Sequence, residues 1–430
     1  MKSRKKTAAS VSKRVILPQL FGLIVLGRAA DAQSSVPQTS TLQPLAPPVE
    51  SVTSLNMTNE FQVFAPRPAA SAPGPYEPFQ WDQFVLRPHF DYQFMVAHGI
   101  LASPGNPQNT TIQYFSPGIL LNLGPHWALD YTLGLGFYSN NNFSTEVNNS
   151  IVLTGQTFYR DWVIGFLQNA LLSTSPLIET GGQTTQQTFD TVITGHHETS
   201  EHTSLDLQGA QSLQFFSGGG FENVRSWSTT DWFNYEPQSH FNIGIGPGLG
   251  YNNVDFGPDS LFVQAQGRLS WRISQKLSVQ LSGGAQETKF LGNTAVGNVF
   301  SPIYGGSIQY QPFSETEFAV YASRSFSPSA FVGQYTDSTS FGATLSQRFL
   351  GQFYASLNAG YGHQEYVASS IFNTTGGRTD KFYSLAARLS HSFLERGSVA
   401  IFYMYGQDNS SLPGYSYSSN QYGVEVSYSF

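Results

Sequence analysis

A repeated unit in which apolar and polar residues alternate runs along the chain, and residues 112–138 show it most clearly. From Trp127 to Phe137 every second residue is large and apolar or aromatic, whereas the residues between them are Ala, Asp, Thr and Gly. A period of two is the signature of a β-strand with one apolar face. The turn signal Gly124-Pro-His126 comes just before this strand, so the unit is predicted to be a tight antiparallel hairpin.

This alternation fits two kinds of structure. In a soluble β-sandwich the apolar face packs inward and the polar face meets water. In an outer-membrane β-barrel the apolar face meets lipid and the small, polar face lines a lumen. The pattern within a single hairpin does not choose between them.

The same alternation predicts about 18 strands, and 16 strands is the alternative because residues 150–173 show the pattern weakly. The predicted strands are 84–96, 112–123, 127–137, 150–159, 162–173, 184–197, 203–216, 226–236, 240–252, 260–273, 277–288, 302–310, 316–326, 338–349, 353–365, 381–393, 398–407 and 421–430.

The predicted connections alternate in length. Short ones lie at 124–126, 160–161, 237–239, 274–276, 350–352 and 394–397. Long ones, rich in Asn, Ser, Gly and Thr, lie near 97–111, 139–149, 174–183, 217–225, 252–259, 289–301, 327–337, 366–380 and 408–419. Short turns on one side and long loops on the other are typical of outer-membrane barrels, whose turns are periplasmic. An even number of strands would place both ends of the barrel in the periplasm.

The first 80 residues have a different character. Residues 1–14 carry six basic residues and no acid, an apolar run follows from Val15 to Gly27, and Ala30-Asp-Ala32 matches a cleavage site. This pattern predicts a secretory signal peptide at 1–32. Residues 33–80 contain repeated prolines without a sustained period, which predicts a disordered periplasmic linker. The barrel domain is then expected at 81–430.

Composition favours the membrane barrel. Charged residues make up 11% of the chain, against about 25% in a typical soluble protein. Residues 1–32 hold seven of the 21 basic residues and one of the 28 acidic ones, so the remainder has 14 and 27, a net charge of −13. This charge argues against nucleic acid as a partner. The chain has no cysteine, which excludes disulfides and thiolate sites.

The last strand and three internal segments resemble known sequences. Residues 421–430 alternate and place aromatic residues at Tyr428 and Phe430, as in the C-terminal assembly signal of bacterial outer-membrane proteins, which the barrel assembly machinery would read. Residues 271–277, 301–310 and 394–399 resemble the strand–turn–strand pattern of the family called Putative beta-barrel porin 2. The resemblance implies an outer-membrane barrel over about residues 82–430, and it carries no catalytic residues.

Catalytic and metal-binding motifs are weak. His197-Glu-Thr-Ser-Glu-His202 lacks the spacing of a zinc-protease motif, and the adjacent His196 and His197 would face opposite sides of a strand. Gly244, Gly246, Gly248 and Gly250 are two apart, which indicates small residues on a lumen face rather than a phosphate loop. We therefore expect no cofactor, no metal and no catalytic residues.

The inward phase of the predicted strands carries the candidate functional residues. These charged side chains would either line a pore or brace the wall by pairing with one another. His89 and Asp91 share this face, a pairing that could also orient a catalytic imidazole. In a water-filled lumen, Arg268 and Arg272 are expected to be solvated. The candidate pore-lining residues are Arg87, His89, Asp91, Asp130, Asp206, Arg268, Arg272, Arg388 and Glu425.

The sequence thus predicts a bacterial outer-membrane porin that lets small solutes diffuse passively, because barrels of 16–18 strands leave an aqueous channel. Lipid, the assembly machinery and small solutes are the expected partners, and an oligomer is compatible with the pattern. The alternatives are an outer-membrane enzyme, or a structural or export barrel without an open channel.

The C-terminal strand generates a first prediction. Deleting Phe430 should reduce the amount of folded protein in the outer membrane, because the closing strand must be recognised and paired before the barrel has no free edge. Heat-modifiable mobility on a gel measures the folded fraction. An unchanged folded fraction would contradict the assembly-signal interpretation.

Overall fold

The computed structural model describes residues 79–81, 84–177, 179–217, 220–292, 297–368, 377–393 and 396–429. The predicted signal peptide, nearly all of the predicted linker and Phe430 lie outside the described residues. Among the residues that are described, no helix is long and apolar enough to cross a membrane.

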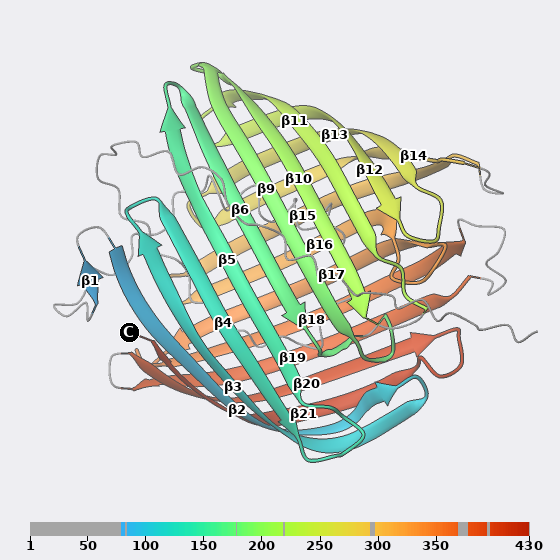
Figure 1. Ribbon diagram of the computed structural model, residues 1–430. Coiled ribbons are helices and arrows are strands. Elements are labelled where there is room, and N and C mark those ends of the chain that lie inside the picture. The colour runs from blue at the N-terminus through green and yellow to red at the C-terminus, as the bar shows by residue number, and fades with distance from the viewer. Residues whose placement is uncertain are drawn as a thin grey trace, which may run out of the picture. The chain divides into compact units, whose positions relative to one another are not determined.

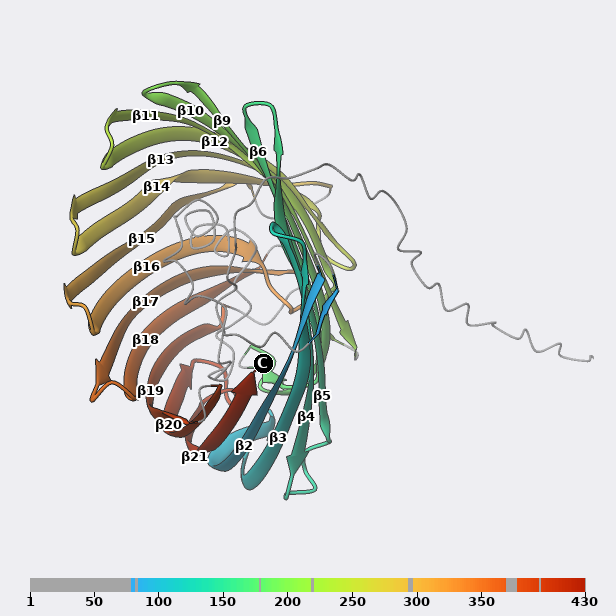
Figure 2. The same ribbon diagram turned by 90° about the vertical axis from the view of Figure 1, so that its left-hand side faces the viewer.

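The described chain forms one antiparallel sheet that closes on itself (Figure 1). Eighteen strands within the described ranges make up its wall. Each pairs with its neighbours in sequence, and β2 also pairs with β21, with His89 opposite Ser429. In Figure 2, β2–β6 form the right-hand side of the barrel, and β11–β21 curve around its left-hand side. The prediction of a closed barrel of about 18 strands is confirmed.

The wall strands run in chain order. They are β2 (Phe84–Ser103), β3 (Asn106–Leu123), β4 (Trp127–Tyr138), β5 (Glu146–Tyr159), β6 (Trp162–Ser173), β9 (Thr185–Ser200), β10 (Thr203–Ser217), β11 (Val224–Gln238), β12 (Phe241–Val254), β13 (Ser260–Ser274), β14 (Leu277–Phe290), β15 (Val299–Phe313), β16 (Thr316–Pro328), β17 (Gln334–Phe349), β18 (Phe353–Ala368), β19 (Thr379–Phe393), β20 (Gly397–Ser410) and β21 (Tyr417–Ser429).

Three two-residue strands complete the set. β1 (Gln80–Trp81) pairs with the start of β2, and β7 (Pro176–Leu177) and β8 (Gly182–Gln183) pair with each other within the β6–β9 connection.

Most wall strands extend further on the loop side than the alternation predicted. The long loop expected at 97–111 is wrong, because β2 and β3 continue to Ser103 and Asn106 and leave a connection of residues 104–105. Bulges after Ala97 and Leu101 allow this extension. Gly99 has a φ of 76°, and a Cβ there would lie 2.0 Å from the Ser418 carbonyl oxygen, so only glycine fits.

Large apolar side chains lie on the outside of this barrel. Ile245 is 68% exposed and Ile401 57% exposed, and the apolar faces predicted for β12, β13, β17 and β19–β21 supply many of the other exposed hydrophobic residues. The inward face carries buried polar side chains, such as Gln264 at 3% exposure. A soluble sandwich would show the reverse, so the lipid-facing alternative is the one that the structure supports.

One hairpin separates from its neighbour β15 but stays paired with β18. β15 and β16 pair only as far as Tyr304 and Arg324, although β16 runs on to Pro328 while still paired with β17. Phe326, near the end of β16, and Tyr335, at the start of β17, pack with Phe290 of β14. Gln286 and Thr288, on the same face as Phe290, are buried on the inward side of β14. We call residues 325–336 the inward hairpin tip.

Contacts with the nearby strands β13 and β14 hold this tip. The Tyr335 hydroxyl donates to the Ser260 hydroxyl of β13 at 2.7 Å, and the Gln286 amide donates to the Phe326 carbonyl at 3.3 Å. The ring centroids of Phe290 and Tyr335 lie 4.9 Å apart. The tip therefore lies against the lumen side of β13 and β14 at the loop end of the barrel.

The phase of β4 gives a second prediction. Leu133 faces lipid and Thr132 faces the lumen, so arginine at Leu133 should cost about 2–4 kcal/mol near the bilayer midplane, and arginine at Thr132 much less. Reversible denaturation of the two variants in lipid measures the difference. Equal costs would mean that the assigned faces are wrong.

Candidate functional site: the lumen wall and the loop junction

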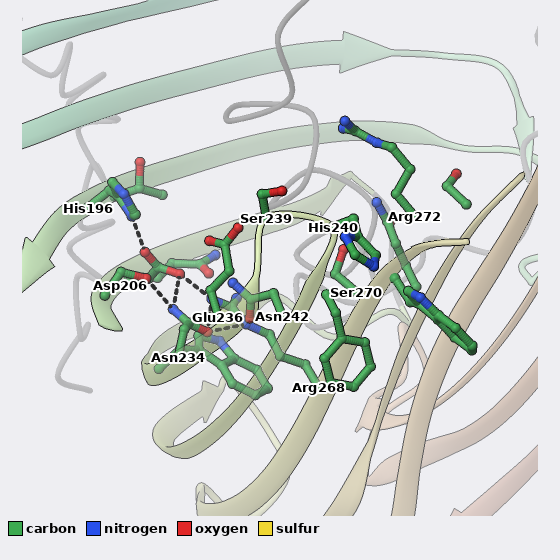
Figure 3. A pocket seen from close by; sticks show the side chains of 18 of the residues that line it. His196, Asp206, Asn234, Glu236, Ser239, His240, Asn242, Arg268, Ser270 and Arg272 are labelled. Carbon is green, nitrogen blue, oxygen red and sulfur yellow. Dashed lines mark hydrogen bonds and ion pairs between the residues drawn. The ribbon is translucent and has the colours of Figure 1, made fainter. Parts of the chain in front are cut away.

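A cavity of about 480 Å³ lies against the inward face of β9–β15 (Figure 3). Four of its polar residues form a hydrogen-bonded network: His196 of β9, Asp206 of β10, Asn234 of β11 and Arg268 of β13. His196 Nδ1 lies 2.5 Å from one Asp206 oxygen, and the Arg268 guanidinium pairs with the other. Asn234 accepts from Arg268 Nε at 2.9 Å and donates to Asp206 at 2.9 Å. Four strands are thus joined across the lumen wall.

The glycines of β12 make this network fit. Arg268 lies over the Trp232 ring of β11, with its guanidinium carbon 4.5 Å from the ring centre, although β12 separates their strands. A Cβ at Gly246 would lie 2.7 Å from the Trp232 ring, and one at Gly244 would lie 2.5 Å from Asn234. The small lumen face predicted for these glycines is therefore confirmed, because it lets side chains of β11 and β13 meet above β12.

Arg268 differs from its expected state. Its side chain is only 9% exposed and is held by Asp206, Asn234 and the Trp232 ring, so the expectation of a solvated side chain is wrong. The physical reason is that carboxylate and amide partners lie within reach across the glycine strand. Arg272 lies two positions further toward the turn on the same face of β13, beyond Ser270. It is exposed and lies apart from this network (Figure 3).

Two other predicted residue sets also come together on the wall. Arg388 of β19 donates to Glu425 of β21 at 2.7 Å, and Gln93 of β2 donates to the same carboxylate at 3.5 Å. This contact joins the strands on both sides of the seam where the barrel closes. His89 of β2 lies 3.2 Å from Asp130 of β4. Charge pairing across strands is thus a general feature of this wall.

The remaining predicted residues lie on β2 and β21, on the two sides of the seam where the barrel closes. Arg87 and Asp91 share the inward face of β2 with His89, and the Asp91 carboxyl lies next to Ser427 of β21. Tyr428 lies near the end of β21, opposite Phe90. His196 and His197 face opposite sides as predicted, since His197 stacks on Trp162 with ring centroids 4.9 Å apart. Within the described residues, no cluster of three or more potential ligands could hold a metal ion.

At the loop end of the barrel, connections from opposite sides of the wall meet on the inward hairpin tip. Eight strands, β9 to β16, separate the β6–β9 connection from the β16–β17 connection, which is nearly half of the circumference. Nevertheless, Glu179 of the first accepts from the Ser329 hydroxyl at 2.6 Å and from the Ala330 amide at 3.0 Å. The mouth is therefore crossed by polypeptide.

A second connection reaches the same tip. The Glu222 carboxylate, in the β10–β11 connection, accepts from the Gly333 amide at 2.9 Å and from the Phe256 amide at 2.8 Å. The Glu222 amide donates to the Ala330 carbonyl at 2.7 Å, and Phe221 forms an antiparallel bridge with Phe331. Side-chain carboxylates therefore make much of the contact between these loops.

Arg378 links two further connections to this meeting point. Its guanidinium carbon lies 4.0 Å from the Tyr415 ring centre, 4.8 Å from that of Tyr366 and 5.5 Å from that of Phe331. It donates to the Glu179 carbonyl at 2.9 Å and to Asp380 at 2.9 Å. We call Glu179, Glu222, residues 329–333, Arg378 and Tyr415 the loop junction.

Burial changes the chemistry of the junction. Burial raises the pKa of the Glu179 carboxyl above its usual value, even though the Ser329 hydroxyl and the Ala330 amide favour the ionised form. Sequence reasoning missed every residue of the junction. The acids and Arg378 stand in loops, where no alternation marks a face, and their partners are up to about 200 positions away in the chain.

The Arg268 network predicts a difference in stability between two inward arginines. Arg268→Ala should destabilise the barrel by about 2 kcal/mol, because it leaves Asp206 and Asn234 without their partner in a partly buried site. Arg272→Ala, the matched control, should change the free energy of unfolding by less than about 0.5 kcal/mol, as exposed positions do. Urea unfolding in lipid bilayers compares them, and equal stabilities would refute the bracing role.

Part of the chain is similar in sequence to a known protein family. Residues 254–430 match the family model described as Putative beta-barrel porin 2. No curated protein matches the chain in sequence.

Similar solved structures include Acinetobacter baumannii OccAB4, at 10% identity with a TM-score of 0.43, covering 80% of this chain and 98% of that one. Pseudomonas aeruginosa OpdQ matches at 11% identity with a TM-score of 0.44, covering 81% and 99%. Pseudomonas aeruginosa OccK2 (OpdF), in complex with glucuronate, matches at 8% identity with a TM-score of 0.44, covering 80% and 98%. From Val254 to Phe430, the chain is similar to the family Putative beta-barrel porin 2, which its strand–turn–strand segments already resembled.

Proposed function

We propose that this protein is a porin of the bacterial outer membrane, through which small solutes diffuse passively. The observation that carries the proposal is the reversed distribution of side chains on a closed barrel: large apolar residues face outward, and buried polar residues face inward. Such a surface matches lipid, and such an interior matches water and polar solutes. The family match over residues 254–430 supports the same function.

The proposal includes the orientation. The predicted signal peptide would direct the chain to the periplasm, and the assembly machinery would insert the barrel from there by reading the last strand. The short turns would then be periplasmic, together with the 33–80 linker and the C-terminus, and the loop junction would face outward.

The candidate lumen residues have two roles in this proposal. Arg268, Asp206, Arg388 and Glu425 brace the wall by pairing. Arg272 is exposed on the inward face near the turn end, so it is the residue best placed to act on passing ions. A fixed charge acts over about one Debye length, roughly 8 Å at physiological salt.

Reconstitution into planar bilayers tests the channel function. The wild-type protein should conduct, and solutes of graded size should define a cut-off. Arg272→Ala should shift the reversal potential in a salt gradient toward cation selectivity while leaving the barrel folded. A folded protein that never conducts would remove the porin proposal and favour an enzyme or a structural or export barrel.

A further inference from the structure

We propose that the loop junction is a gate at the outer mouth of the channel. Protonation of buried carboxyl groups at the junction keeps this gate closed. This inference rests on the proposed channel function and adds a regulatory mechanism to it. The gate is the contact between the inward hairpin tip and the connections that reach it from the opposite wall.

The first argument is geometric. The wall is held by continuous ladders of backbone hydrogen bonds, whereas the junction depends largely on Glu179, Glu222 and Arg378. A small set of such side-chain contacts can open at a lower free-energy cost than a strand that is paired along its whole length. Beyond Arg324 the tip is no longer paired with β15, so on that side it can move without breaking the β15–β16 ladder, whereas Gln334–Thr336 stay paired with β18.

The second argument is a charge count. Arg378 is the guanidinium that acts on three carboxyl groups in this region, those of Glu179, Asp380 and Asp408. Asp380 takes the ion pair, with one oxygen 2.5 Å from Arg378 Nη2. Arg378 can compensate only one of these three carboxylates, so ionising all of them leaves an excess of negative charge beside the closed junction.

Asp408 stands in wall strand β20, outside the loop junction as defined above, but its carboxyl group interacts with the charges of Arg378 and Asp380. It lies near the loop end of β20 between Phe382 and Tyr417 on the neighbouring strands, is 0% exposed, and neither carboxylate oxygen has a hydrogen-bond partner in the described part of the chain. Burying an ionised carboxylate without a partner costs several kcal/mol, so the closed state favours a protonated Asp408. Asp380 and Arg378 are the charged groups that act on it.

Glu179 acts in the same direction. Its neighbours are the Ser329 hydroxyl, the Ala330 amide and the charges of Arg378 and Asp380, and burial outweighs the groups that favour ionisation, so its pKa is raised in the closed state. Because the pKa of Glu179 is raised in the closed state, this group stabilises the closed state fully at pH values below the usual glutamate pKa of about 4.3. That stabilisation is lost as the pH rises through the raised pKa. Acid therefore closes the gate and alkali opens it.

The test is single-channel recording of the full mature protein in planar bilayers at symmetric pH values between 5 and 8.5. The open fraction of the wild type should rise with pH. Asp408→Asn and Glu179→Gln keep the shape of the side chain without its charge. Each should keep the channel closed at pH 8.5 and reduce the open-to-closed ratio by about tenfold for each pK unit by which closing disfavours ionisation. Arg378→Gln should open the channel at every pH.

The matched control is Asp190→Asn. Asp190 is also a buried carboxyl on the inward face, but it pairs with Ser212 within the β9–β10 wall at 2.7 Å. This variant should keep the pH dependence of the wild type. Heat-modifiable gel mobility verifies that every variant is folded.

A crosslink provides a measurement that does not depend on the carboxyl variants folding. Phe221 and Phe331 are bridge partners, and the chain has no cysteine of its own, so Phe221→Cys with Phe331→Cys can form a single disulfide. The oxidised protein should stay closed at pH 8.5, and reductant should restore opening.

The outcomes separate the two proposals. If no variant conducts at any pH, including Arg378→Gln and the reduced double-cysteine protein, the channel function itself fails. If the protein conducts but its open fraction is independent of pH, or Asp408→Asn and Glu179→Gln both keep the wild-type dependence, the gate is overturned and the channel stands. Opening of the oxidised crosslinked protein would likewise overturn it.

Discussion

Backbone hydrogen bonding in lipid is the constraint on which the rest of this structure depends. The hydrocarbon core offers no water to an unpaired amide or carbonyl, so a sheet can span it only if no strand edge is left free. The pairing of β2 with β21 removes that edge. Once the sheet is closed, every residue of every wall strand faces either lipid or lumen. The period-two pattern of the sequence is the direct result.

Closure with 18 strands makes the interior too wide for a hydrophobic core, so polar side chains must satisfy one another there. The wall does this by pairing charges across strands, as in the contacts of Arg268 with Asp206 and of Arg388 with Glu425. The glycines of β12 are part of this solution, since a Cβ at Gly244 or Gly246 would clash with the side chains of β11 and β13 that meet over them, among them Trp232 and Arg268. A glycine stripe and a buried arginine thus have one shared cause.

The limits of sequence-based prediction follow from the same physics. Within the bilayer, alternation is enforced by lipid on one side, and the predicted strands and faces there match the structure; the predicted strand 162–173 has the observed ends of β6. Beyond the bilayer this constraint ends. The extension of β2 past Val96 depends on bulges and on Gly99, and the departure of β16 from β15 depends on packing against Phe290. Loop contacts such as Glu179 with Ser329 join residues 150 positions apart, and nothing in either segment marks the other.

The two parts of the molecule therefore differ in what they can tolerate. A charge on the lipid-facing side of the wall acts against membrane transfer and is costly wherever the strand spans the bilayer. The loop junction lies outside that region, and its acids and Arg378 contact one another and neighbouring loops, not lipid. If the junction is a gate, changes there would shift the balance between closed and open mouths while leaving most of the wall ladders in place. Because the wall is stable by itself, the contacts at the mouth can be weak. The ionisation of one carboxyl group can shift an equilibrium between two conformations only if their free energies are close.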